Sequence, residues 1–153
     1  MRIAFVSDEP ADVHQNIREI LEKRGHEISA FGAIASGEEC PWVPAAEEAA
    51  RAVASGECDE GVFLCWTGTG VSMVANKIGG IRAALCTDPE TASGARVWNH
   101  ANVICLSNRS LTPAEAERIL SAWFDTDPGS KGQEGVRQLK ELDRSTRSQE
   151  RSA

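Results

Sequence analysis

The sequence of 153 residues contains no tyrosine and only three histidines, although it has four tryptophans. It also lacks an uninterrupted run of about 18 apolar residues, so no membrane-spanning helix is expected. The first residues lead directly into a strand-like pattern and lack the charged, apolar and cleavage regions of a signal peptide. The sequence therefore predicts a cytoplasmic location.

A clustered basic stripe is missing as well, and the formal net charge is -7. The basic residues near the C-terminus alternate with acidic ones, which is typical of a solvated helix and tail. Nucleic acid and anionic membranes are therefore poor candidates for partners. Hydrophobic residues make up 41% of the chain, which favours a globular domain over a disordered one.

The five cysteines are odd in number, and no two of them have C-x-x-C spacing. This pattern argues against a disulfide framework and against a zinc site, so no metal is expected. Cys86 and Cys105 end apolar runs and are expected to be buried thiols, while Cys58 is expected in a loop. Only Cys65 has a setting that suggests chemistry.

Five short apolar runs alternate with helical patterns. The strands are expected at residues 2–7, 27–31, 61–65, 81–86 and 103–107, and the helices at 14–23, 45–55, 71–77, 89–98, 113–124 and about 134–144. This order predicts an α/β protein with a Rossmann-like three-layer fold, in which helices cover both faces of a five-stranded parallel sheet. One domain is expected over residues 1–145, followed by a polar tail over residues 146–153.

In such folds, ligands bind beyond the carboxyl ends of the strands. The strongest signal at that edge is residues 65–72, with the sequence CWTGTGVS. Its glycines allow a tight turn into a helix, so successive N–H groups can bind a phosphate, a carboxylate or a developing oxyanion. Cys65 precedes this turn, in a position that favours a thiolate and suits a base or nucleophile. A buried strand-end cysteine beside an ordinary turn is an equally open interpretation.

Several polar and aromatic residues have more than one interpretation. Asp8 follows the first strand and can bind a substrate hydroxyl, but capping of the next helix is the favoured interpretation. Trp98 is interpreted as a residue that closes the core at a helix end. His14 is expected to be exposed and His26 to lie at a strand edge, and no chemistry is assigned to either.

Three segments resemble one known family. They are AVASGE from residue 52, GVFLCWTGTG from residue 61 and ANKIGGIRAALC from residue 75. Together with the opening strand and the Asn99–x–x–Asn102–Val pattern, they resemble the ribose-5-phosphate isomerase B family, which includes the galactose-6-phosphate isomerase subunits. The resemblance runs from residue 2 to about residue 142.

The resemblance implies a homodimer, or a dimer of dimers, with active sites shared between two subunits. It also implies aldose–ketose isomerisation of a sugar phosphate through a cis-enediolate, with no metal and no cofactor. The catalytic cysteine of the family falls on Cys65, and its companion threonine falls on Thr67. Further residues that fall on positions of the substrate site are Asp8, Gly68, Thr69, Gly70, Ser72, Asn99 and Arg109, and Trp66, directly after Cys65, is a candidate for substrate binding by its place in the chain.

The departures from the family concern the substrate. Glu9 replaces a histidine, Trp42 replaces a tyrosine of the site, and Trp98 replaces the histidine that opens the furanose ring. Of two arginines that grip the phosphate, one position holds Lys131 and the other holds glycine, with Arg137 two residues later as a candidate substitute. An indole has no basic nitrogen, so Trp98 cannot move the proton that ring opening requires.

None of these departures affects Cys65 or Thr67. The hypothesis is therefore an isomerase of a short or open-chain sugar phosphate, such as a tetrose 4-phosphate, which cannot close a furanose ring. Branches of the family that act on four-carbon sugar phosphates also lack the ring-opening histidine. The alternatives are a non-phosphorylated sugar-like substrate in a pocket walled by Trp42, Trp66 and Trp98, and a non-catalytic binding or partner subunit.

Overall fold

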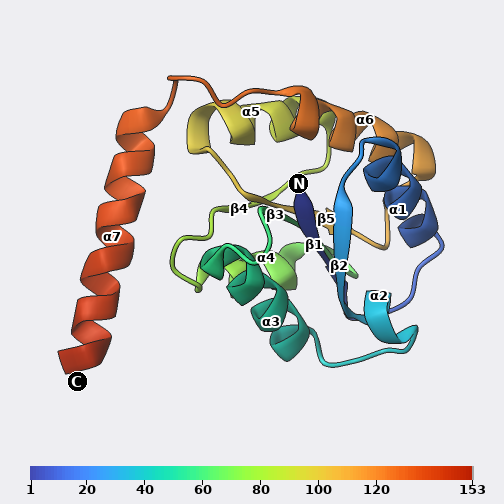
Figure 1. The fold of residues 1–153 in the computed structure, drawn as a ribbon, viewed down its shortest axis with the longest axis horizontal. Coiled ribbons are helices and arrows are strands. Elements are labelled where there is room, and N and C mark those ends of the chain that lie inside the picture. Colours follow the sequence, from blue (N-terminus) through green and yellow to red (C-terminus); the bar gives the residue numbers. More distant parts are fainter. Residues whose placement is uncertain (153) are drawn as a thin grey trace.

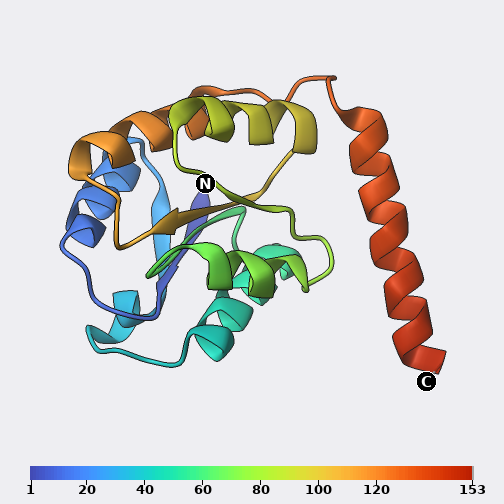
Figure 2. The same cartoon turned by 180° about the vertical axis from the view of Figure 1, so that it is seen from behind.

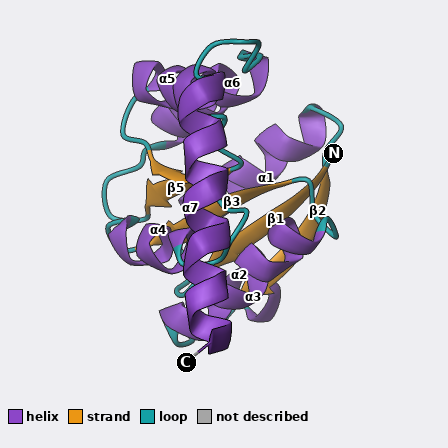
Figure 3. Cartoon of the chain, turned by 90° about the vertical axis from the view of Figure 1, so that its left-hand side faces the viewer, coloured by secondary structure: helices purple, strands orange, loops and turns teal. Residues whose placement is uncertain are grey.

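The computed structural model describes residues 1–152 (Figures 1, 2 and 3). Five parallel strands form one sheet in the order β2-β1-β3-β5-β4. The strands are β1 (Arg2–Ser7), β2 (Glu27–Gly32), β3 (Glu60–Cys65), β4 (Ala83–Leu85) and β5 (Val103–Ser107). The helices are α1 (Val13–Lys23), α2 (Ala33–Ser36), α3 (Trp42–Ser55), α4 (Thr69–Asn76), α5 (Pro89–Asn99), α6 (Pro113–Asp125) and α7 (Gln133–Ser152).

Helices cover both faces of the sheet, as the sequence predicts. One layer contains α1, α5 and α6, and the opposite layer contains α3 and α4 (Figures 1 and 2). Side chains of β3 alternate between the layers: Val62 and Leu64 pack with the first, and Phe63 and Cys65 pack with the second. Because both faces are covered, β3 is buried at every residue, and its sequence after Glu60 is an uninterrupted apolar run.

Helix α7 stands apart from both layers. Figure 3, which faces α7, shows the helix crossing the edge of the sheet from the α5–α6 layer toward the α3–α4 layer. Asp143 of α7 accepts a hydrogen bond from the backbone N–H of Gly80 over 2.9 Å. A cavity of about 360 Å³ lies between α7 and β4, and Leu139, Leu142, Arg82 and Asn99 are among its lining residues. No helix within residues 1–152 is both long and apolar enough to cross a membrane.

The boundaries differ from the expected ones at three places. Strand β4 is shorter than residues 81–86, because the backbone N–H of Ile81 binds the Ile78 carbonyl and that of Arg82 binds the Asn102 side chain. Residues 32–44, expected as a loop, contain α2 and the first turn of α3. Helix α7 continues to Ser152, past its expected end near residue 144, and Ala153 of the expected tail lies outside the described residues.

A buried ion pair joins β3 to α5 and α6. Oε1 of Glu60 lies 2.9 Å from a guanidinium nitrogen of Arg96, and both side chains are at most 14% exposed. The indole N–H of Trp123 donates to the other carboxylate oxygen over 2.8 Å, and Arg96 also donates to the Ala101 carbonyl over 2.6 Å. Every charged atom therefore has a partner except Nε of Arg96, which is buried without one among the described residues.

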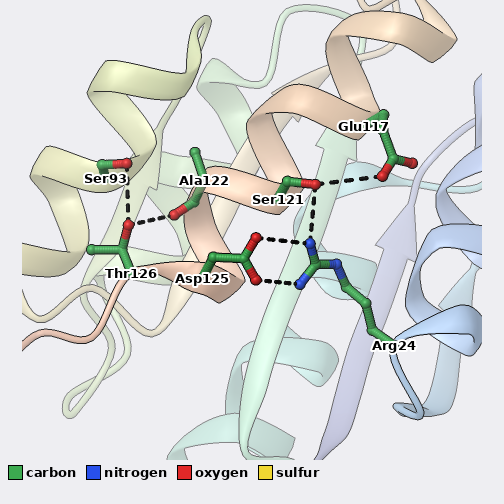
Figure 4. Close-up of polar contacts among 7 residues, drawn as sticks. All are labelled: Arg24, Ser93, Glu117, Ser121, Ala122, Asp125 and Thr126. Carbon is green, nitrogen blue, oxygen red and sulfur yellow. Dashed lines mark hydrogen bonds and ion pairs between the residues drawn. The ribbon is translucent and has the colours of Figure 1, made fainter.

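A second, more exposed contact ties α1 to α6 (Figure 4). Arg24, just after α1, donates to both carboxylate oxygens of Asp125, over 2.8 and 3.2 Å, and to Ser121 over 3.0 Å. Thr126 binds the Ala122 carbonyl and the Ser93 hydroxyl, which links the end of α6 to α5. The helices of the first layer are thus joined by polar contacts as well as by the core.

Replacing Arg96 by methionine should destabilise the fold strongly, because it leaves the Glu60 carboxylate buried without a cation. We expect the free energy of unfolding to fall by about 3–5 kcal/mol, measured by chemical denaturation. The matched control is Arg24→Met, which removes an ion pair whose carboxylate is exposed to water and should cost much less. Equal losses in the two variants would contradict this account of the buried pair.

Candidate functional site

The ends of β3 and β5 are tied together where the predicted turn begins. The backbone N–H of Asn108 donates to the Cys65 carbonyl over 2.9 Å, and that of Arg109 donates to the Trp66 carbonyl over 3.0 Å. The Ser107 hydroxyl also donates to the Trp66 carbonyl, over 2.8 Å. The position of the Cys65–Trp66 peptide is therefore set by β5, its neighbour in the sheet.

Gly68 allows the chain to turn from β3 into α4. Its φ is +77°, and a Cβ at this position would lie 2.9 Å from the backbone carbonyl of Leu106. Helix α4 begins at the next residue, and no side chain among the described residues caps its N-terminus. The first N–H groups of α4 are therefore available to an anion. The hydroxyls of Thr67 and Thr69 lie 2.6 Å apart beside them.

Cys65 is buried, whereas the three tryptophans among the candidate site residues, Trp42, Trp66 and Trp98, are exposed. Cys65 is 7% exposed, whereas Trp66, directly after it, is 58% exposed. The indole of Trp42, at the start of α3, lies against the turn: a Cβ on Gly70 would be 3.1 Å from its ring. The structure thus brings Cys65, Thr67 and Trp42 together around the start of α4. Trp98 is 59% exposed, so its interpretation as a core residue is wrong.

Asp8 does not cap a helix. The N-cap of α1 is Asp12, and no side-chain cap bond forms there, so the capping interpretation is wrong. Oδ1 of Asp8 is buried with no hydrogen-bond partner in the part of the chain that the structure describes. Burial raises the pKa of Asp8, and the nearby carboxylates of Glu9 and Glu39 raise it further. Oδ1 of Asp8 is therefore an acceptor held next to the site and left without a partner among the described residues.

The sequence led us to expect that His14 is an exposed helix residue, and this expectation is wrong. His14 is half-buried, and its Nε2 lies 2.7 Å from Oδ1 of Asn108, just after β5. Burial lowers the pKa of His14, although the bond to Asn108 and the charge of Glu9 act in the opposite direction. A signal was present in the sequence: the first turn of a helix that follows a parallel strand starts at the carboxyl edge, and His14 stands there.

Trp98 and Asn99 lie at the opposite edge of the sheet. Because α5 runs back antiparallel to the strands, its last residues, Trp98 and Asn99, lie where β4 and β5 begin. Arg82, just before β4, donates from Nε to the Asn99 and His100 carbonyls, over 3.1 and 2.9 Å. The structure therefore separates Trp98 and Asn99 from Cys65 within one chain.

Lys131 belongs to this second group. Its ammonium lies 5.8 Å from the centre of the Trp98 ring, and its carbonyl is bound to Nε2 of His100 over 2.7 Å. His100 holds a left-handed conformation, with φ +45°, which is uncommon for a residue other than glycine. A side chain on Gly132 would overlap the Trp98 carbonyl, so residues 131–132 pack directly on the end of α5.

The two arginine candidates differ in their surroundings. Arg137 lies on α7 and is paired there with Glu134 and Glu141. Arg109 follows β5 at the same edge as Cys65, is exposed, and forms no ion pair within residues 1–152. Arg109 is therefore the cation at the carboxyl edge whose charge is not engaged by a carboxylate of the described chain.

The turn at Gly68 provides a test of this geometry. In Gly68→Ala, a Cβ must occupy a left-handed position against the Leu106 carbonyl, so we expect a loss of about 1–3 kcal/mol in the free energy of unfolding. The matched control is Gly94→Ala within α5, where a Cβ meets no atom within 4 Å. That substitution should stabilise the protein slightly, by about 0.5–1 kcal/mol. Similar effects in both variants would contradict the proposed strain.

Comparison with known proteins gives one family over nearly the whole chain. The sequence matches the ribose/galactose isomerase family over residues 3–142. It is 36% identical over 128 residues to D-erythrulose-4-phosphate isomerase of Pectobacterium atrosepticum, covering 83% of this chain and 84% of that protein. It is also 36% identical over 125 residues to ribose-5-phosphate isomerase B of Escherichia coli, covering 80% and 83%.

The fold matches solved structures equally well. The structure of Clostridium thermocellum ribose-5-phosphate isomerase B aligns with a TM-score of 0.87 and 34% sequence identity. The alignment covers 95% of this chain and 99% of that one. The structural similarity therefore covers nearly the whole chain.

Proposed function

Because the chain belongs to the ribose/galactose isomerase family and is a sugar-phosphate isomerase, we propose that it interconverts the aldose and ketose forms of a short or open-chain sugar phosphate. A tetrose 4-phosphate is the candidate substrate. The observation that carries this proposal is Trp98, an exposed indole where the resembling family has its ring-opening histidine. The relative named D-erythrulose-4-phosphate isomerase, at 36% identity, supports it.

The carboxyl edge has the groups that the reaction requires. Cys65, as thiolate, removes the proton from the carbon next to the carbonyl and returns it to the neighbouring carbon. The free N–H groups at the start of α4 stabilise the enediolate oxygen that forms between the two transfers. The Thr67 hydroxyl, which is next to that of Thr69, moves the proton between the two substrate oxygens. No step changes the oxidation state of the molecule as a whole.

The amino edge has no basic group at the position where the resembling family has its ring-opening histidine. The indole nitrogen of Trp98 carries no lone pair that can accept a proton. His100, two residues later, uses Nε2 to bind the Lys131 carbonyl. A tetrose 4-phosphate does not need this step, since its phosphate occupies the oxygen that would close a furanose ring. The amino edge is therefore compatible with an open-chain substrate.

We propose further that two copies of the chain form the complete site, as a homodimer or a dimer of dimers. The support is the separation within one chain: Cys65 and Thr67 lie at the carboxyl edge, whereas Trp98, Asn99 and Lys131 lie at the amino edge. In a dimer with shared sites, the amino edge of one subunit faces the carboxyl edge of the other. Lys131 then adds a cation for the phosphate.

We also propose a cytoplasmic location for the protein.

A non-phosphorylated, sugar-like substrate is the second candidate. The observation that favours it is the acidic surrounding of Asp8, where Glu9 and Glu39 both raise the pKa of the carboxyl group. Exposed indoles of Trp42 and Trp66 at the same edge can stack on a sugar. A rise in melting temperature with sugar phosphates but not with the free sugars would decide against this candidate.

Replacing Cys65 by alanine should abolish proton exchange while leaving binding largely intact. We expect the rate of solvent deuterium incorporation at C2 of a tetrose phosphate to fall by about 10²–10⁴-fold, measured by NMR. Cys58→Ala is the matched control, because Cys58 is a buried thiol in the loop before β3. Exchange that persists in Cys65→Ala would show that another base carries the reaction.

Replacing Trp98 by histidine tests the argument on ring opening. An imidazole at this position can exchange a proton with the ring oxygen, so turnover of ribose 5-phosphate should rise relative to that of a tetrose 4-phosphate. The measurement is kcat/KM for both substrates, in the variant and in the wild-type protein. If the ratio does not change, the pocket excludes pentoses by its shape, and the argument from Trp98 is wrong.

A further inference from the structure

A chain of hydrogen bonds crosses the carboxyl edge of the sheet, from α1 to the loop after β1. Nε2 of His14 lies 2.7 Å from Oδ1 of Asn108. Nδ2 of Asn108 lies 3.0 Å from the Ser7 hydroxyl and 3.3 Å from Oε1 of Glu9. The Ser7 hydroxyl in turn donates to the Glu9 carbonyl over 2.8 Å. Neither His14 nor Asn108 has a part in the proton transfers of the proposed reaction.

The hydrogen bonds from His14 through Asn108 end on the Glu9 carboxylate. The backbone N–H of Ala11 donates to Nδ1 of His14 over 3.3 Å, so the hydrogen-bond network assigns the ring proton to Nε2. Nε2 therefore donates to Oδ1 of Asn108, and this leaves the amide nitrogen of Asn108 to donate to the Glu9 carboxylate. The tautomer of His14 thus determines the orientation of Asn108, and Asn108 determines that of Glu9.

The surroundings of His14 favour its neutral form. Its ring packs edge-on against Phe5, with 5.9 Å between the ring centres, and burial lowers the pKa of the imidazole. A protonated ring would carry a second N–H at Nδ1, directed at the Ala11 N–H. Neutral His14 can therefore hold the network in one arrangement, whereas the imidazolium form cannot.

The network lies next to the candidate base, Cys65. It also borders a group of three carboxylates, those of Asp8, Glu9 and Glu39, which we call the acidic corner. Asn108 donates its backbone N–H to the carbonyl of Cys65 over 2.9 Å. Glu9 and Glu39 are near enough to Asp8 to raise its pKa, and Oδ1 of Asp8 is buried without a partner within residues 1–152. A phosphate dianion in this corner would meet like charges, whereas a hydroxyl group could donate to a carboxylate.

We propose that His14 and Asn108 are positioning residues that hold the Glu9 carboxylate at this corner, where it accepts a hydrogen bond from a substrate hydroxyl and keeps the phosphate away. The proposal rests on the proposed isomerase function and specifies the orientation of its substrate: the hydroxyl-bearing end lies at β1, and the phosphate lies away from β1. Glu9, a departure from the resembling family, thereby becomes a specificity residue.

The kinetic test compares His14→Leu with His14→Gln, using a tetrose 4-phosphate and the full chain. Leucine has no donor for Asn108, so KM should rise about tenfold while kcat stays within about twofold, as for a lost substrate hydrogen bond. Glutamine can still donate to Asn108 and should restore most of the affinity. His26→Leu is the matched control, because the His26 ring is also half-buried against an aromatic ring and its two nitrogens have no hydrogen-bond partner in the described chain. It should leave KM unchanged.

Two results would overturn the proposal. One is an unchanged KM in His14→Leu, and the other is an equal loss in His14→Leu and His14→Gln that falls on kcat instead of KM. If His14→Leu does not fold, Glu9→Gln carries the test, because its amide keeps the shape and the bond to Asn108 but removes the charge. Inorganic phosphate should then bind about fivefold more tightly than to the wild-type protein, measured by the shift in melting temperature.

The phosphate titration requires no turnover, so the two proposals can fail separately. A wild-type protein without activity on any aldose or ketose phosphate would overturn the proposed function. Phosphate affinity that is unchanged or weaker in Glu9→Gln would overturn the role of Glu9 at this corner. If His14→Leu folds, its phosphate affinity should shift in the same direction as that of Glu9→Gln. The Glu9 carboxylate is then no longer held at the acidic corner and repels a phosphate there less.

Discussion

The buried ion pair between Glu60 and Arg96 is the interaction on which the rest of this structure depends. Glu60 is the first residue of β3, and Arg96 lies in the last turn of α5. The pair, together with Trp123 of α6, holds the end of α5 against the start of the central strand. Cys65 stands at the other end of the same strand. Strand β3 therefore links the two groups: Cys65 lies at its end, and the end of α5, with Trp98 and Asn99, packs near its start.

This arrangement explains why one chain contains two groups of candidate residues that do not meet. Parallel strands require each connecting helix to run back across the sheet, so a helix that starts at the carboxyl edge ends at the amino edge. The turn at residues 65–72 starts a helix at one edge, whereas Trp98 and Asn99 end a helix at the other. Completion of the site by a second copy remains the proposal that this geometry supports.

The unusual composition of the chain is concentrated in these two groups. Trp42 lies on Gly70 at the carboxyl edge, and Trp98 lies under the Lys131 ammonium at the amino edge. Around Asp8 the carboxylates of Glu9 and Glu39 make the surroundings acidic and raise the pKa of Asp8. The groups proposed for proton transfer, Cys65 and Thr67, stand on the sheet and its first turn, while the altered residues stand at helix ends and loops. Substrate preference can therefore change without a change in the reaction.

Local patterns in the sequence determined the order of the strands and of every helix except α2, the boundaries of β1 and β5, and the position of the turn at Gly68, because apolar runs and glycines act over a few residues. They also determined the family. They did not determine that His14 is half-buried, that Asp8 lacks a partner or that Trp98 is exposed, because each of these depends on residues far away in the chain. His14 meets Asn108, 94 residues later, only because β1 and β5 end at one edge of the sheet. The tertiary structure alone decided which side chains meet, since burial and hydrogen bonding are set by contacts that the sheet topology brings together.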